Sequence, residues 1–506
     1  YIDPPFPGQW ECWGLGCGVS AGDPGVMWRL GRSLPERVGR GEASRGEAEL
    51  IGRERALGLR PGQPFLLRPD GVPDVDVLGY FASPSFGLLS DQTQLSYAKD
   101  LRLFLSFLEG QGRRWREASF DDALDYEFWR RRDERNPRRV SASKFAREWA
   151  ACQRFYLWQQ RRGVVAGSPS SVIDPGGSAG LRSHREARSN RVKWLTPRAY
   201  SQWRSIGLAG CTLDGERDSR WRGRNDGRNT AFADLLWSSG LRLREGGSLL
   251  LMELPGLDAE SSYLAGRIGP EVAKMRRGRD FWVSREALSG IEAYVLSSRA
   301  AAIGRAHQAG RYTSGDRLLL TDRHGPRLTV REESTGRDRA VLVGDLSLSQ
   351  RRQLFVQGPG GWEPAMVFLG ESGVPMDPDS WERVFAQASR RCHRLGVPVS
   401  CHPHMLRHSF ALRMLLTLTH AFDRRMGLTP EERREYRLMF GDPWVLVQTL
   451  LGHRSPETTR SIYLEPVSGL QVELFLNDDG VSEDAAFSST VTRHLARTGL
   501  VNLGME

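Results

Sequence analysis

Three histidines and an arginine stand close together in the segment HPHMLRHSFALRML. On a helix His404, Arg407 and His408 would share one face, because positions i, i+3 and i+4 are neighbours there. Leu406 and Phe410 would point the other way, into a core. A face that combines guanidinium and imidazole groups is suited to binding an anion and moving a proton.

Zinc binding is the alternative for two histidines four residues apart. The acidic residue that the HExxH pattern places between them is absent, and Arg407 would repel a cation. We therefore expect no metal ion and no other cofactor.

Two further segments carry groups of the same kind. SGLRLRE bends at a glycine and then presents Arg242 and Glu245 three residues apart. LLGHRSPETTRSIYLEP places His453 directly before a predicted helix start and Tyr463 two turns into that helix. A tyrosine hydroxyl can act as a nucleophile, and arginines can stabilise the charge that grows on a phosphate.

In this order the segments resemble the tyrosine recombinases, also called phage-type integrases. The family pattern is T/S-G-L-R-x-x-E, H-x-L-R-H and L-G-H followed by a tyrosine, and this chain has SGLRLRE, HMLRH, LGH and Tyr463. Tyr463 follows His453 by ten positions, where many members have nine. The resemblance covers about residues 90 to 470. It implies the catalytic residues Arg242, Lys274, His404, Arg407, His453 and Tyr463.

The resemblance also implies what these residues do in a site-specific recombinase that cleaves and rejoins duplex DNA. Tyr463 would form a 3′-phosphotyrosine, while Arg242 and Arg407 would stabilise the phosphate. His404 and His453 would hydrogen-bond the phosphate and assist proton movement at the tyrosine.

Three nearby residues have lesser roles or none. Glu245 is expected to hold the Arg242 region in place, and His408 to orient its helix or pack. His402 receives no role.

Lysine is rare in this arginine-rich chain. The only lysines are Lys99, Lys144, Lys193 and Lys274. In EVAKMRRGRDFWVS, Lys274 lies between two predicted strands, where the family has a lysine. An amine can release a proton and guanidinium effectively cannot, so Lys274 is predicted to protonate the departing 5′ hydroxyl. The alternative is a surface lysine retained by chance.

The charge of the chain favours a polyanionic partner, which the resemblance specifies as double-stranded DNA. Its 506 residues carry a formal net charge of +10, with a pI of about 9.6. Two arginine-rich stretches are the predicted phosphate contacts, one in a loop and one at the end of a linker rich in Gly, Pro and Ser. They comprise Arg130, Arg131, Arg132, Arg138, Arg139, Arg182, Arg185, Arg188, Arg191 and Lys193.

Cellular location is predicted from what the sequence lacks. Six cysteines in a chain of this length are too sparse for a disulfide framework. There is no run of about 18 apolar residues and no signal pattern at the start. We expect a cytoplasmic, nucleoid-associated protein with no membrane partner.

Changes of composition divide the chain into five predicted segments. They are an N-terminal extension of unknown role at 1–88, a helical core-binding domain at 89–165, a basic linker at 166–192, a catalytic domain at 193–470 and a tail at 471–506. The patterns predict a mainly α chain with an α+β catalytic domain. Residues 311–358 are expected to form an inserted hairpin or irregular excursion. The resemblance implies a C-shaped clamp on DNA, built from the helical domain and the mixed α/β catalytic domain.

The resemblance also implies that the protein acts as a homotetramer on paired DNA sites, with accessory DNA-bending or directionality proteins as possible partners. It further implies that the protein is the integrase or transposase of a mobile element. Two other readings stay open: an enzyme like the type IB topoisomerases, and a DNA-binding protein that has lost catalysis.

Overall fold

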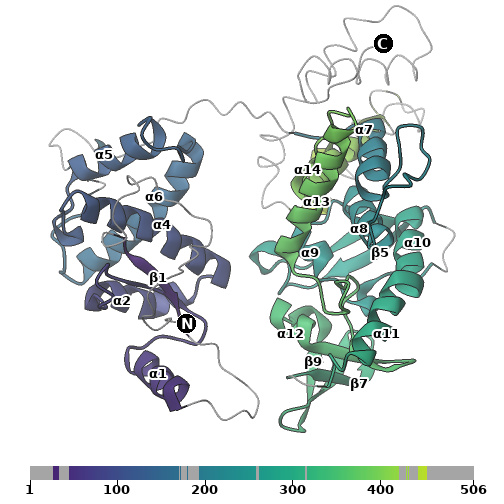
Figure 1. Cartoon of the computed structure of the whole chain (residues 1–506), viewed down its shortest axis with the longest axis horizontal. Coiled ribbons are helices and arrows are strands. Elements are labelled where there is room, and N and C mark those ends of the chain that lie inside the picture. Colours follow the sequence, from purple (N-terminus) through teal and green to yellow (C-terminus); the bar gives the residue numbers. More distant parts are fainter. Residues whose placement is uncertain are drawn as a thin grey trace, which may run out of the picture. The chain divides into compact units, whose positions relative to one another are not determined.

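The structure is a computed structural model, and Figure 1 shows the chain. It describes residues 27–33, 45–169, 171–172, 179–180, 193–257, 261–313, 316–420, 429, 431 and 443–452. The chain divides into two compact units, Tyr1–Arg188 and Ser189–Glu506. Among the described residues, none of the helices is long and apolar enough to cross a membrane.

The first unit is mainly helical. Its helices are α1 (Arg45–Ala56), α2 (Val75–Ala82), α3 (Pro84–Gly87), α4 (Asp91–Gly110), α5 (Phe120–Arg131) and α6 (Ala142–Arg161). Its strands form two antiparallel pairs, β1 (Arg29–Arg32) with β2 (Pro64–Leu67) and β3 (Ser171–Val172) with β4 (Ala179–Gly180). Ser90, Ser119 and Ser141 begin the long helices, because each side chain accepts a backbone hydrogen bond from the first turn.

Apolar side chains of α4 and α6 form the core of the first unit with residues that precede them. The rings of Phe104 and Trp149 meet edge to face, with centroids 5.1 Å apart. Trp28, Phe65 and Phe81 belong to the same core. The described residues before position 88 therefore pack on the helical bundle, while any further role for this segment stays a prediction.

The second unit mixes helices and strands. Its helices are α7 (Pro197–Gln202), α8 (Asp226–Ser239), α9 (Leu243–Gly247), α10 (Arg285–Tyr294), α11 (Ala300–Gln308), α12 (Leu348–Gln353), α13 (Pro378–Arg394), α14 (Pro403–His420) and α16 (Pro443–Leu451). Its strands are β5 (Tyr263–Ile268), β6 (Arg279–Ser284), β7 (Leu318–His324), β8 (Arg327–Glu332), β9 (Asp338–Leu342), β10 (Leu354–Gly358) and β11 (Gly361–Pro364). The prediction of a helical part followed by a mixed α/β part is confirmed.

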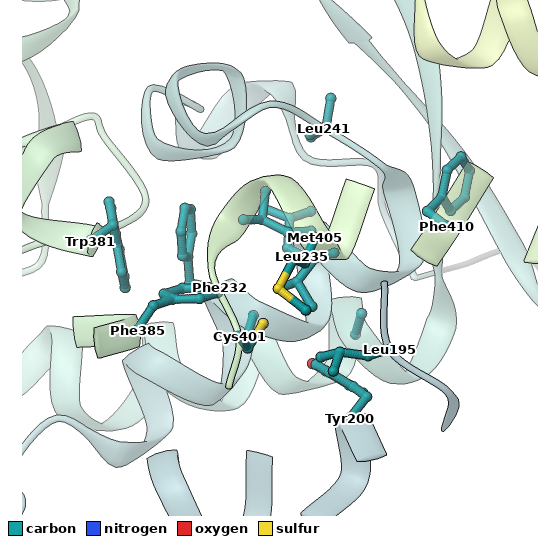
Figure 2. Packing of buried hydrophobic residues seen from close by; sticks show 14 of the residues in the cluster. Leu195, Tyr200, Phe232, Leu235, Leu241, Trp381, Phe385, Cys401, Met405 and Phe410 are labelled. Carbon is teal, nitrogen blue, oxygen red and sulfur yellow. The ribbon is translucent and has the colours of Figure 1, made fainter. Parts of the chain in front are cut away.

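Helices α8, α13 and α14 of the second unit pack around one apolar core (Figure 2). Phe232 of α8 stacks on Trp381 of α13, with ring centroids 3.7 Å apart. Met405 and Phe410 bring α14 into the same core. This packing fixes the end of α8 against α14, and Arg242, His404 and Arg407 lie at or next to these two places.

Residues 311–358 form most of a five-stranded sheet, which differs from the predicted hairpin or irregular excursion. The strand order is β11-β10-β7-β8-β9, with β10 parallel to β7 and every other pair antiparallel. Leu318, Leu328 and Leu354 belong to a small core of this sheet. In Figure 1 the sheet lies at one end of the second unit, near α11 and α12. A parallel pairing across α12 joins distant residues, which local patterns do not reveal.

Candidate active site

A left-handed glycine turn places Arg242. Helix α8 ends at Ser239, and Gly240 has a φ of 64°. The Gly240 N–H donates to the Leu236 carbonyl at 3.0 Å. A Cβ at position 240 would lie 2.3 Å from Cδ1 of Phe410, so both the conformation and the space require glycine. Helix α9 begins directly after Arg242.

Glu245 joins Arg242 to a second arginine, Arg279 at the start of β6. The Glu245 side chain is 1% exposed. Its Oε1 accepts hydrogen bonds from Nη1 of Arg242 at 2.8 Å and Nη1 of Arg279 at 2.9 Å. Its Oε2 accepts from the backbone N–H of Arg242 at 2.8 Å and from Nη2 of Arg279 at 2.6 Å. Burial would raise the pKa of Glu245, but the hydrogen bonds and charge of Arg279, followed by those of Arg242, lower the pKa to about 2.

Arg407 is buried, which differs from the predicted polar face of α14. Its exposed fraction is 2%. Its Nη1 donates to the Gly240 carbonyl at 2.7 Å, and its Nη2 donates to the Leu451 carbonyl. The predicted apolar residues of α14 are buried as well. Because Gly240 begins the turn that carries Arg242, the two predicted phosphate-stabilising arginines come from one small region.

His404 lies one helical turn before His408, and the centroids of the two rings are 4.4 Å apart. Partial desolvation, followed by nearby positive charge, lowers the pKa of His404 to about 4, although its side chain stays exposed at the surface. The groups that contribute charge are Arg407, His402, Arg242 and Lys274. The imidazole of His404 is therefore neutral at physiological pH. The charges of three predicted catalytic residues, Arg242, Lys274 and Arg407, therefore all act on this ring.

Lys274 lies in the turn between two strands, as predicted. It begins a short 3₁₀ segment, Lys274–Arg276 (η4), that connects antiparallel β5 and β6. Arg276 has a φ of 54°, a left-handed conformation that residues with a Cβ rarely adopt. Lys274 is exposed, so its amine is accessible from solvent.

His453 and Tyr463 lie outside the described residues. The residues directly before His453 are described, and they contact both arginines. The Gly452 carbonyl oxygen is 3.5 Å from Nη2 of Arg242, and the Leu451 carbonyl accepts a hydrogen bond from Arg407. The end of α16 therefore meets the turn after α8.

The predicted phosphate contacts separate into paired and exposed residues. Arg130 is buried and binds the two oxygens of Glu148 at 3.0 Å each, while its contact with phosphate stays a prediction. Arg131 donates to Glu127 at 2.6 Å. The exposed residues of the set are Arg132, Arg138, Arg139 and Lys193. Those outside the described residues are Arg182, Arg185, Arg188 and Arg191.

Arg279 is the residue of this site that the sequence reasoning missed. It follows Lys274 closely and opens the strand-like segment RDFWVS. The available signal was an arginine that opens the strand, directly after the turn of Lys274 and before the apolar stretch Phe281, Trp282 and Val283. Within the described ranges, no group of three or more His, Cys, Asp or Glu side chains is arranged to hold a metal ion.

Comparisons with known proteins find relatives for both units. Residues 87–163 match the family model of the phage integrase N-terminal SAM-like domain. The chain is 24% identical over 278 residues to the tyrosine recombinase XerC of Xylella fastidiosa, covering 55% of this chain and 63% of that protein. It is 26% identical over 213 residues to the tyrosine recombinase XerC of a Roseiflexus species, covering 42% of this chain and 58% of that protein. The chain thus spans less than two thirds of these curated relatives.

One solved structure is similar over most of its length. It is the Tn1549 transposon integrase in complex with transposon right end DNA, with a TM-score of 0.43 and 12% identity. The match covers 81% of this chain and 95% of that chain. A score this low supports no conclusion about function.

Proposed function

Since this chain belongs to the tyrosine recombinase family, we propose that it cleaves and rejoins duplex DNA through a 3′-phosphotyrosine at Tyr463. One observation carries the proposal. Arg242 and Arg407 come from distant parts of the sequence, and both contact the residues that lead into His453. Four of the six residues that the family pattern supplies are described, and the positive charges of Arg242, Lys274 and Arg407 lower the pKa of the fourth, His404.

In the proposed reaction the Tyr463 oxygen attacks the scissile phosphorus, and the bond from phosphorus to the 5′ oxygen breaks. Arg242 and Arg407 stabilise the negative charge that grows on the non-bridging oxygens. Lys274 gives a proton to the departing 5′ oxygen, and the tyrosine proton passes to a histidine. Rejoining runs these steps in reverse, so the energy of the phosphodiester bond is kept.

His404 suits a hydrogen-bonding role in this scheme. Its pKa of about 4 leaves the ring neutral at physiological pH, so one ring nitrogen can donate and the other can accept. A neutral ring adds no further positive charge beside the two arginines. An incoming phosphate would raise the pKa of His404, because an anion favours the protonated form.

A more specific proposal concerns the substrate, the oligomeric state and the biological role of the protein. We propose double-stranded DNA as the substrate, a homotetramer on paired sites as the acting form, and an integrase or transposase of a mobile element as the role. This part rests on the motif resemblance and the basic charge of the chain. Sequencing the genomic DNA that the protein binds, together with the genes beside its own, tests the setting and supplies the DNA site.

Covalent capture tests the catalytic proposal. The DNA site is nicked beside the expected cleavage position, so that the released fragment diffuses away and the protein stays attached. The wild-type chain should form a covalent adduct, and Tyr463→Phe should form none. An adduct that persists in Tyr463→Phe would refute the assigned nucleophile. Binding without any wild-type adduct would favour a DNA-binding protein that has lost catalysis.

A second assay separates recombination from topoisomerase activity. Supercoiled plasmids that carry two sites or none are incubated with the protein. A recombinase should yield exchanged products only from the plasmid with two sites. Relaxation of both plasmids to the same extent, with no exchange, would indicate an enzyme like the type IB topoisomerases.

A further inference from the structure

We propose that Arg279 is a positioning residue that keeps Arg242 available to the scissile phosphate. This inference rests on the proposed DNA cleavage. Arg279 is the first residue of β6, and its side chain is 9% exposed. It acts through Glu245 rather than by touching DNA.

Two guanidinium groups share the carboxylate of Glu245. Each oxygen of Glu245 accepts one hydrogen bond from Arg279 and one from Arg242. Arg279 engages both oxygens with a two-pronged fork, whereas the Arg242 side chain donates to only one. The single negative charge of Glu245 is thus held mainly by Arg279, and Arg242 keeps more of its positive charge for an incoming anion.

Arg279 also contacts the end of α16. Its Nε donates to the Leu450 carbonyl at 3.3 Å. Gly452 has a φ of 61°, and a Cβ there would lie 2.8 Å from Cδ of Arg279. The glycine therefore lets the chain pass close over the arginine, just before His453.

Arg279 lies next to the turn of the β5–β6 hairpin. It pairs with Ile268 at the last register position before the turn that carries Lys274. One side chain thus connects the hairpin turn, the Arg242 region and the segment leading into His453. Without Arg279, the Glu245 carboxylate would have only Arg242 as a charged partner and would draw its guanidinium away from the phosphate.

The experiment compares two scissile groups in nicked DNA that traps the covalent adduct. One is the ordinary phosphodiester, and the other is a methylphosphonate, in which a methyl group replaces one charged non-bridging oxygen. A neutral group has less need of a fully charged Arg242. Single-turnover rates are measured for both at saturating DNA, so the rate ratio within one protein preparation does not depend on the fraction that is folded.

Arg279→Met should slow cleavage of the phosphodiester by about tenfold or more, a fraction of the loss expected from removing a direct stabilising group. The loss on the methylphosphonate should be clearly smaller, and DNA affinity should change little. Arg279→Lys, which keeps the charge and one donor, should restore part of the rate. Arg267→Met is the matched control, because Arg267 lies exposed on β5 in the same hairpin and pairs with Asp280 at 2.8 Å.

Equal losses on both groups, or a phosphodiester rate like that of the wild type, would overturn the role of Arg279. A second comparison uses the Glu245→Gln background. There Arg279→Met should have a smaller effect on the phosphodiester rate, since the shared carboxylate is already gone, and an undiminished effect would also count against the proposal. Absence of a wild-type adduct would instead refute the proposed function, so the two failures are distinguishable.

Discussion

The carbonyl oxygen of Gly240 accepts a 2.7 Å hydrogen bond from the buried guanidinium of Arg407, across 167 positions of sequence. Gly240 has no side chain, and its left-handed conformation turns the chain toward Arg242. The same arginine donates to the Leu451 carbonyl. Arg407, which is predicted to bind phosphate, therefore also holds the end of α16 against the turn after α8. The effects of its mutation on stability and on catalysis must be measured separately.

Arg407→Met should lower the free energy of unfolding by about 2–4 kcal/mol, because two buried carbonyls lose their donor. Urea unfolding measures this loss. Covalent adduct formation should also disappear under conditions where the variant is folded. Arg244→Met, at an exposed position on α9, should change the free energy of unfolding by less than about 0.5 kcal/mol. Similar values for the two variants would contradict the structural role.

Gly240→Ala should lower the free energy of unfolding by about 2–4 kcal/mol. A left-handed conformation disfavours alanine, and the new Cβ would overlap the Phe410 ring. Gly290→Ala on α10 is the control, since no atom lies within 4 Å of a Cβ there. That exchange should stabilise the protein by roughly 0.5–1 kcal/mol, because alanine favours helix. Thermal unfolding of both variants checks the contrast in sign.

His404 should make stability depend on pH between about 6.5 and about 4. Its pKa falls from 6.5 to about 4 on folding, so the unfolded chain takes up a proton first as pH drops. Stability from this residue is therefore full above pH 6.5 and declines as pH falls through the window. His404→Gln should lose less stability than the wild type between pH 7 and pH 4. Parallel unfolding curves for the two proteins would show that the ring is not perturbed.

Glu245→Gln should remove the part of the free energy of unfolding that comes from the ionised Glu245 carboxylate, which is lost as the pH becomes acidic. The pKa of Glu245 is about 2 when folded against an ordinary 4.5, so its ionisation stabilises the fold above pH 4.5, by at most about 3 kcal/mol. This contribution declines as pH falls from 4.5 toward 2. Wild-type and variant stabilities should therefore approach each other in that range. Asp280→Asn, in an exposed pair with Arg267, should cost less than about 1 kcal/mol at pH 7.

Lys274→Arg should keep DNA binding and slow cleavage severely, because guanidinium does not release a proton at neutral pH. A bridging phosphorothiolate, in which sulfur replaces the departing oxygen, should restore the rate because a thiolate leaves without a proton. Arg277→Lys makes the reverse exchange in the same turn and should leave cleavage unchanged. If the phosphorothiolate gives no rescue, the proton donor is another residue.

The sequence predicted those parts of the site that depend on local patterns. Helix α14, the glycine bend before Arg242 and the turn that carries Lys274 follow from spacing and residue type. The burial of Arg407 did not follow, because its partners are carbonyls of residues far away in sequence. Arg279 was not predicted for the same reason, because its partners Glu245 and Leu450 are distant in sequence and contact it only in the folded structure.

The fold shows the same division between local and distant information. Caps and apolar spacing can be recognised locally in α4, α6 and α7, whose first turns bind the side chains of Ser90, Ser141 and Thr196. The sequence predicted a hairpin or an irregular excursion where the structure has a five-stranded sheet. The pairing of β10 with β7 joins residues on opposite sides of α12, so local patterns did not reveal it. The apolar periodicity of a helix can be recognised within a few turns of sequence. The order of strands in a sheet depends on pairing partners that lie far away in the sequence.

The scarcity of lysine gives the exposed hairpin turn a practical use. Acylating reagents modify primary amines and leave guanidinium groups unchanged, and the only lysines are Lys99, Lys144, Lys193 and Lys274. Lys193 and Lys274 are the exposed ones, so mass spectrometry of a briefly acylated sample would follow the turn of Lys274 as one of two readily modified sites. The protein thus carries a built-in reporter in the middle of its candidate site, with no need for an added label.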